Sequence, residues 1–559
     1  MRLSRIEIEN FKGIAAKQVI DLAPITLLFG ANSAGKSTIL QALHYLREVL
    51  SRANPDPDQT LAGGLIDLGG FANLIHAHDL NRTMTIKIVI DGVDGFGADH
   101  LPLNAGGSLT APEFEQLPIR YLLGENTDLK DYAVVQSVGV SVSVAWSELN
   151  AQPYVSAITV QLDNKDVATI SSPPQSGRAI LSDINFEHDL FHRIVDQIEP
   201  DDPDEGLSKH PLADEVAELS REMADSDAVP ESSYRVSIKT VRGALPDLNS
   251  TLTSDLRDPD VSKVEFERAS PRVRGLENLL DELVVGPMRV ARDYLNETTY
   301  IGPLREIPPR GFQPKLSPDE ARWAQGLAAW DLLYSDRKGD LLKRVNFWLS
   351  GKDRLGTNYE ILRTERRDIP TTSRMHQLFA RGITEDDLSE LQEAYTDLHP
   401  TNEIVLRDFA QNITVSPVDV GVGISQMIPV VVACLKKNPG VVMVEQPELH
   451  IHPAIQVGLG DLFLSATSAD LNSMSDGKTL LIETHSEHIM LRLLRRVRET
   501  SNNQLPPGAM SAQAKDIAVI YVENKDQTVE FKRMNVDSDG DFSDRWPRGF
   551  FRERAKELF

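Results

Sequence analysis

The sequence has little of what several common protein classes depend on. Only one of its 559 residues, Cys434, is a cysteine, which excludes an intrachain disulfide and a cysteine-based metal cluster. It has no uninterrupted apolar run of about 18 residues, so we expect no membrane-spanning helix. Its first residues lead straight into an alternating strand pattern and lack the apolar core of a signal peptide. We therefore expect a soluble cytoplasmic protein in which Cys434 is a small buried residue.

Basic residues are also scarce. The chain has 58 Lys and Arg against 83 Asp and Glu, a formal net charge of -25. Such a surface repels nucleic acid on average, so any contact with DNA or RNA requires a local basic patch or a partner. Two arginine clusters have two possible interpretations: a solvated protein surface, or a track that binds nucleic-acid phosphates. The clusters consist of Arg363, Arg366 and Arg367, and of Arg492, Arg495, Arg496 and Arg498.

The most informative segment is residues 30–37, GANSAGKS, which fits the phosphate-binding pattern G-x-x-x-x-G-K-[ST]. An apolar strand pattern at 25–29 precedes it, and an apolar helix pattern from Thr38 to about Ser51 follows. Glycines let consecutive N–H groups point at phosphate oxygens, and the helix N-terminus adds positive potential. Lys36 can reach the outer phosphates, and the Ser37 hydroxyl can ligate Mg²⁺. The predicted nucleotide-binding residues are Gly30, Asn32, Ser33, Ala34, Gly35, Lys36, Ser37 and Thr38.

Two later apolar runs, 441–445 and 479–483, read as buried parallel strands. Ligands gather at the carboxyl ends of such strands. Glu445 ends the first run and is predicted to hold Mg²⁺ through water, with Gln446 and Glu448 extending polar groups along the same rim. His485 follows the second run and is predicted to sense the γ-phosphate or to hold attacking water.

A third feature is the segment GVGISQ at 421–426, which precedes an apolar helix expected at 427–435, with Ser425 at its start. It predicts a second helix N-terminus suited to anions. One triphosphate rarely needs two such ends from the same side. We therefore expect two chains, each giving this segment to the nucleotide that the other holds. The residues predicted to act in this way are Gly421, Gly423, Ser425 and Gln426.

In this order, the motifs resemble those of the ABC-type ATPases of the SMC, RecF and OLD group. The resemblance covers the N-terminal RLSRIEIENFKG, the loop at 30–37, the signature-like 421–426, a Walker B segment at 441–453 and the switch histidine in ETHSEH. It implies an α/β ABC-type ATPase head, with mixed β-sheets and flanking helices, interrupted by a large, mainly helical insertion. ATP and Mg²⁺ are the implied cofactors. Stand-alone prokaryotic members of the PtuA type, found in Septu and retron-associated defence, look most similar.

The expected domain organisation follows from where the motifs lie. Residues 1–95 and 401–515 form the two parts of the ATPase head, 96–400 an insertion of helical arms with some strands, and 516–559 a C-terminal tail domain. Within the insertion, Asp196–Gly206 is acidic and interrupted by prolines, which predicts an exposed connection. Residues 213–224 have helical periodicity.

The chain departs from its relatives at one position. In the resemblance, Glu445 aligns with the acidic residue of the relatives that binds Mg²⁺. Gln446 aligns with their second acidic residue, the base that activates water. An amide can orient water but cannot accept its proton near neutral pH. Either Glu448 or His485 assists, or hydrolysis is slow. We expect weak ATPase activity, with ATP acting as an assembly switch.

The resemblance implies a homodimer around ATP that regulates a partner nuclease in antiviral defence. An HNH-type nuclease is the expected partner, and a retron reverse transcriptase with its nucleic acid is a further candidate. No membrane partner is expected. One alternative is a DNA repair or chromosome-maintenance ATPase that binds DNA directly. Another is a non-hydrolysing scaffold that needs ATP only for assembly.

Overall fold

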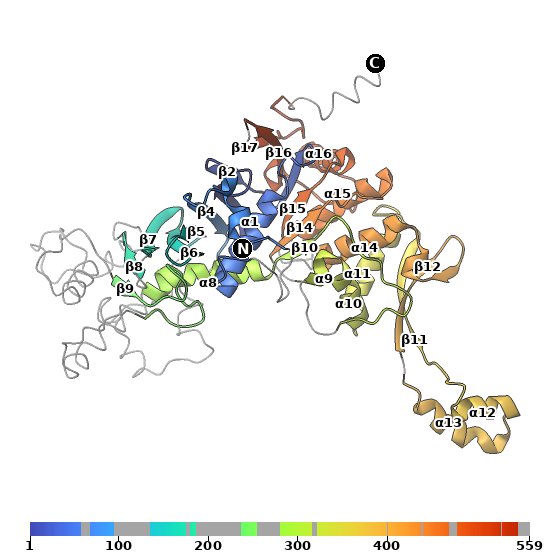
Figure 1. Cartoon of the computed structure of the whole chain (residues 1–559). Helices are drawn as coiled ribbons and strands as arrows, with labels where there is room; N and C mark the ends of the chain where they lie inside the picture. The colour runs from blue at the N-terminus through green and yellow to red at the C-terminus, as the bar shows by residue number, and fades with distance from the viewer. Residues whose placement is uncertain are drawn as a thin grey trace, which may run out of the picture.

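A computed structural model gives the fold (Figure 1). The expected connection at 196–206 and the helical pattern at 213–224 lie outside the residues that it describes. The described residues are 1–57, 67–93, 135–174, 179–185, 236–253, 280–315, 321–399, 401–437, 440–468, 478–526 and 528–545.

The first sheet is antiparallel and begins at the N-terminus. Its strands occur in the order β2-β1-β4-β5-β6-β7-β8-β9. Alternation of apolar and polar residues gives the sheet one buried face, which packs against helices α1 (Thr38–Arg52) and α8 (Gly286–Asn296). The strand bounds are β1 Arg2–Glu9, β2 Gln18–Asp21, β4 Met84–Asp91, β5 Ser137–Ser147, β6 Gln152–Leu162, β7 Lys165–Ser171, β8 Ala179–Ser182 and β9 Val236–Ile238.

The second sheet carries the predicted motifs, in the order β10-β14-β15-β3-β16-β17. The first five strands are parallel, and β17 pairs antiparallel with β16. Side chains of β3 enter two different hydrophobic cores. Leu28 faces the core shared with the first sheet, whereas Leu27 and Phe29 face the core on the opposite side. Burial on both faces explains why these strands are continuously apolar. The bounds are β10 Thr299–Ile301, β14 Val441–Glu445, β15 Thr479–Glu483, β3 Ile25–Gly30, β16 Ile517–Lys525 and β17 Thr528–Met534.

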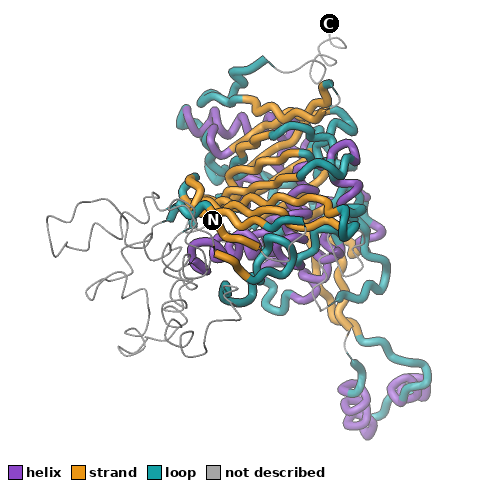
Figure 2. Tube along the Cα trace, turned by 60° about the vertical axis from the view of Figure 1, so that its left-hand side comes forward, coloured by secondary structure: helices purple, strands orange, loops and turns teal. Residues whose placement is uncertain are grey.

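Helices cover the second face of this parallel sheet, so that the strands lie in layers between helices (Figure 2). Three of them belong to the C-terminal part of the chain: α14 Val422–Leu435, α15 Pro453–Thr467 and α16 Glu487–Ser501. Three more come from the segment before it: α9 Ala321–Ala324, α10 Leu327–Ser335 and α11 Asp340–Ser350.

A third, antiparallel sheet of β11 (Tyr359–Arg366), β12 (Thr401–Asp408) and β13 (Ile413–Val415) leads away from the body. At its far end the helices α12 (Arg374–Arg381) and α13 (Leu388–Thr396) stand apart from both cores (Figure 1). The remaining helical turns are α2 Phe71–Leu74, a π-helical turn at Asp281–Val285, and 3-10 turns at His76–His78, Glu385–Asp387, Pro417–Asp419 and Ala514–Asp516.

The expected α/β class, with mixed sheets and flanking helices, is confirmed. Two boundaries differ from the expectation because strand pairing crosses them. Strands β5 to β9, within the expected insertion, extend the N-terminal sheet through the pairing of β4 with β5. Strands β16 and β17, expected in a tail domain, complete the second sheet, because β16 pairs with β3. In the described part of 96–400, helices and strands therefore occur together.

Among the described residues no helix combines the length and the apolar character that crossing a membrane requires.

Candidate functional site

The carboxyl ends of three neighbouring parallel strands bring the predicted motifs together. Strand β15 lies between β3 and β14. Its last residue, Glu483, pairs with Glu445 on β14 and with Leu28 on β3. The loop at 30–37 follows β3, so it opens at the same edge of the sheet. Segments more than 400 residues apart thus meet at this edge of the sheet.

The loop closes tightly over the end of the sheet. A Cβ atom at Gly30 would overlap the carbonyl oxygen of Val522 on β16, so this position accepts only glycine. Lys36 is 4% exposed, and its Nζ donates to the carbonyl oxygens of Gly30 (3.2 Å) and Ala31 (2.9 Å). The predicted phosphate-binding lysine therefore lies inside the curve of the loop.

Ser37 makes a short polar contact across the site. Its Oγ donates to Glu483 Oε2 at 2.6 Å, and Lys36 Nζ lies 3.6 Å from Glu483 Oε1. Glu483 was not among the predicted site residues. The available signal was its position, because it ends an apolar strand just as Glu445 does.

Glu445 is held by two residues that the sequence prediction also missed. Tyr300, on β10, donates its hydroxyl to Glu445 Oε1 at 2.9 Å. Arg305 Nη2 donates to the carbonyl oxygens of Glu445 (2.6 Å) and Gln446 (3.2 Å). Burial, followed by the charge of Glu483, raises the pKa of the Glu445 carboxyl. Burial also lowers the pKa of Arg305 to about 10.

Glu448 positions the switch segment. Its Oε2 accepts from Thr484 Oγ1 and its Oε1 from the His485 backbone N–H, both at 2.7 Å. With both oxygens engaged, this carboxylate fixes the backbone next to His485, a role that differs from the predicted assistance in proton transfer. Burial, and then the charge of Lys36, lower the pKa of His485, which favours the neutral imidazole.

The signature-like segment differs from the prediction in one respect. Helix α14 begins at Val422, earlier than expected, with exposed Gly421 as its N-cap. Ser425 therefore lies in the second turn, where it is fully buried and donates its Oγ to the carbonyl oxygen of Pro417 at 2.7 Å. Gln426 is also buried, and its side chain bonds to the backbone N–H (3.2 Å) and carbonyl of Arg305. Only Gly421 and Gly423 of the four predicted residues reach the surface of this helix end.

Gly423 is where α14 contacts the segment after β14. A Cβ atom there would overlap the carbonyl oxygen of His450. We expect Gly423→Ala to lower the free energy of unfolding by about 1–3 kcal/mol, a typical cost of overpacking. Denaturant unfolding measures this value. Wild-type stability in Gly423→Ala would contradict this contact.

Both arginine clusters are engaged in contacts within the chain. Arg496, 4% exposed, and Arg492 both bind the buried carboxylate of Asp461. These contacts favour a structural role over the phosphate track considered above. The remaining contacts are Arg495 with Glu499, Arg498 with Asp541, Arg366 with Asp368, Arg367 with Glu365, and Arg363 with the carbonyl oxygens of Tyr334 and Asp336.

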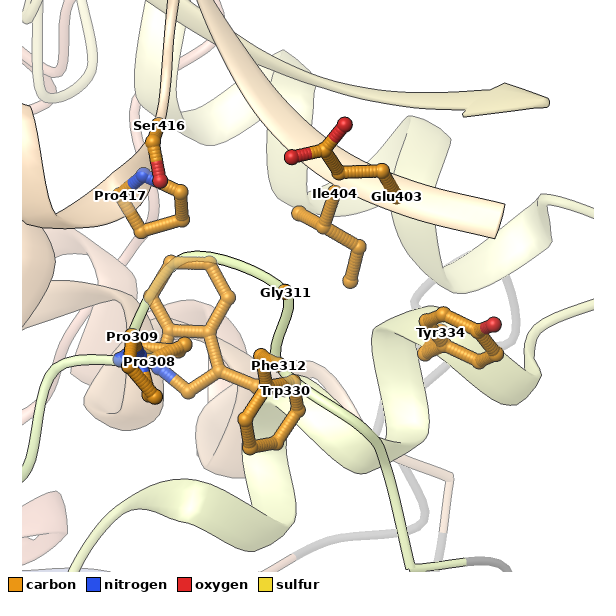
Figure 3. A pocket seen from close by; sticks show the side chains of 10 residues that line it. All are labelled: Pro308, Pro309, Gly311, Phe312, Trp330, Tyr334, Glu403, Ile404, Ser416 and Pro417. Atoms are coloured by element: carbon orange, nitrogen blue, oxygen red, sulfur yellow. The ribbon is translucent and has the colours of Figure 1, made fainter. Parts of the chain in front are cut away.

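A separate hollow lies next to Pro417 (Figure 3). It shares no residue with the loop at 30–37 or with the strand ends. Its lining residues are Pro308, Pro309, Gly311, Phe312, Trp330, Tyr334, Glu403, Ile404, Ser416 and Pro417.

The donor set at the strand ends fits the implied cofactors. The Ser37 hydroxyl and the carboxylates of Glu445 and Glu483 are hard oxygen donors of the kind that Mg²⁺ prefers. Lys36 and the backbone amides of the loop suit phosphate oxygens. In the described ranges, this site included, no cluster of three or more His, Cys, Asp or Glu is arranged to hold a metal ion.

Two family models match the chain, and they cover both parts of this site. Residues 1–132, with the loop at 30–37, match the family described as AAA ATPase domain. Residues 312–491, with α14, Glu445 and His485, match the family described as AAA domain, putative AbiEii toxin, Type IV TA system.

A curated relative and several solved structures add to this comparison. The chain is 24% identical over 132 residues to the DNA replication and repair protein RecF of Acinetobacter baylyi, a match that covers 24% of this chain and 34% of the relative. The chain thus spans about a third of that relative's length. The Smc head domain of Pyrococcus furiosus is 11% identical, with a TM-score of 0.35 over 100% of this chain and 98% of that one. The SMC head domain from Thermotoga maritima is 8% identical, with a TM-score of 0.34 over 96% of this chain and 100% of that one. The two family matches support an ATPase domain of the AAA type.

Proposed function

We propose that the chain binds ATP with Mg²⁺ and hydrolyses it slowly, and that it dimerises around the nucleotide to control a partner protein. The observation that carries this proposal is the convergence of Lys36 and Ser37 with Glu483 and Glu445 at one edge of the sheet. When bound, Mg²⁺ would neutralise phosphate charge between the Ser37 hydroxyl and the acidic strand ends. Lys36 and the loop amides would hold the phosphates.

Slow hydrolysis follows from the side chains next to the phosphate site. Gln446 cannot accept a proton, and both oxygens of Glu448 already accept hydrogen bonds. His485 in its neutral form can orient water or accept a proton, which leaves it as the candidate for this step.

The Gln446→Glu variant tests this account. We expect it to hydrolyse ATP at least about tenfold faster than the wild type, because a positioned base contributes about 10²–10⁴. Steady-state phosphate release measures the rate. Wild-type turnover above about 10 per second, the median for enzymes, would contradict slow hydrolysis. An unchanged rate in Gln446→Glu would contradict the role of residue 446.

Dimerisation is supported by the exposed end of α14. Gly421 is exposed there, and the neighbouring apolar side chains of Val418 and Val422 are 45% and 49% exposed. In the proposed dimer, this end would contact the nucleotide held by the second copy through the backbone amides near Gly421 and Gly423. Ser425 would support the helix end from within.

The proposed biological role is control of a nuclease, of the HNH type, in prokaryotic antiviral defence. The resemblance of the motifs to PtuA-type ATPases supports it. The similarity to RecF favours the alternative, a DNA repair ATPase that binds DNA itself. The pairing of both arginine clusters within the chain argues against that alternative. Co-purification of a nuclease from the native host is the expected result, whereas recovery of DNA with the chain alone would favour repair.

A further inference from the structure

Glu483 occupies an unusual place for a carboxylate. Strand β15 sets it between the loop strand β3 and the strand that ends in Glu445. Its side chain is 9% exposed, and its two oxygens face Ser37 Oγ (2.6 Å) and Lys36 Nζ (3.6 Å). It therefore contacts both residues of the loop that are expected to meet phosphate or its metal ion.

A second carboxylate adds to the negative charge of this edge. Glu445 is the register partner of Glu483 on β14, and it is half-buried. At this edge, the cationic side chain of Lys36 contacts Glu483. A triphosphate that approaches Ser37 would therefore bring its negative oxygens against a carboxylate in a region of low dielectric constant, where like charges repel strongly. A divalent cation between the carboxylate and the phosphates would turn this repulsion into attraction.

We propose that Glu483 is a ligand of the divalent cation, acting together with Ser37, and that it makes ATP binding dependent on that cation. This inference rests on the proposed function, in which the loop at 30–37 binds ATP. Glu483 places a carboxylate at the end of β15, the strand next to the one that precedes the loop. Position 446, where the resemblance leads us to expect a second carboxylate, carries an amide instead. Glu445, held by Tyr300 and Arg305, then lies one strand farther from Ser37.

The test is equilibrium binding of ATP to the full chain, once with Mg²⁺ and once with EDTA. For the wild type we expect Mg²⁺ to raise ATP affinity at least about tenfold, which corresponds to 1.4 kcal/mol. In Glu483→Gln the ratio of the ATP affinity in Mg²⁺ to that in EDTA should fall to about two or less. Affinity in Mg²⁺ should decrease because a ligand is lost, and affinity in EDTA should increase because a repulsive charge is removed. Glu393→Gln, an exposed residue of α13, makes the same charge change far from the site and should keep the wild-type ratio.

A Glu483→Gln variant that keeps the wild-type ratio would overturn the proposal. A wild type whose ATP affinity is the same in Mg²⁺ and in EDTA would also overturn it. If Glu483→Gln does not fold, Glu483→Asp decides. Its carboxylate ends one methylene short of Ser37, so the ratio should decrease, and an unchanged ratio would overturn the proposal. A wild type that binds ATP in neither condition would instead refute the proposed function.

Discussion

The Lys36→Ala variant is expected to bind ATP about 100-fold more weakly than the wild-type chain. Lys36 Nζ lies inside the loop, where its partners are the carbonyl oxygens of Gly30 and Ala31. Two charged hydrogen bonds to phosphate oxygens would contribute about 1.5 kcal/mol each, and each 1.4 kcal/mol changes the affinity tenfold. Equilibrium titration with a fluorescent ATP analogue in Mg²⁺ measures the loss.

Lys515→Ala is the matched control, since it removes an exposed lysine just before β16, at the opposite edge of the parallel sheet. It should bind ATP like the wild type. Lys515→Ala should also unfold at the same denaturant concentration as the wild type, whereas Lys36→Ala, which loses a buried lysine beside Glu483, is checked only for remaining folded in the titration. Wild-type affinity in Lys36→Ala would mean that the loop does not hold the phosphates. Partner assembly that survives the loss of ATP binding would refute the proposed switch.

The Asp461→Ala variant is expected to lower the free energy of unfolding by about 3–5 kcal/mol, the usual cost of removing one partner of a buried ion pair. Asp461 is 2% exposed on α15. It accepts from Arg492 (2.7 and 3.0 Å) and from Arg496 (2.7 and 3.0 Å), both on α16. Without it, two guanidinium groups lose their shared carboxylate between these helices. Denaturant unfolding measures the effect.

The control for this variant is Arg498→Ala on α16, the helix that carries Arg492 and Arg496. Arg498 is half exposed and pairs with the exposed Asp541, so its loss should cost less than about 1 kcal/mol. If Asp461→Ala were as stable as Arg498→Ala, the pairing within the chain would not explain the arginine cluster. These residues would then be available for a role such as phosphate binding.

Much of the site was predictable because its motifs are local. The pattern at 30–37 needs only glycines, a lysine and a hydroxyl at fixed spacing, with a strand before it and a helix after it. The structure places β3 at Ile25–Gly30 and α1 at Thr38–Arg52, as that pattern requires. The two later strands were likewise recognised from continuous apolar runs.

Glu483 was missed because its role depends on strand order. The sequence gives no sign that β15 lies between β3 and β14, and only this pairing sets Glu483 against Ser37. Tyr300 and Arg305 were missed for the same reason, since both reach Glu445 from β10 and the loop after it, more than 100 residues before β14. Long-range pairing of this kind leaves no local pattern.

Ser425 shows a different limit of sequence reasoning. A serine after glycines and before an apolar run is typical of a helix N-cap. Here Gly421 takes that position, because its backbone is extended while Val422 is already helical. The hydroxyl of Ser425 is then satisfied by the Pro417 carbonyl inside the fold. The boundary of a helix depends on such contacts, which composition does not reveal.

The most direct test of the central claim is calorimetric titration of the full wild-type chain with ATP in the presence of Mg²⁺. If the loop at 30–37 and the acidic strand ends form one nucleotide site, each chain should bind one ATP in a saturable manner. The absence of saturable binding up to about 1 mM ATP, a binding free energy of only about −4 kcal/mol, would contradict it.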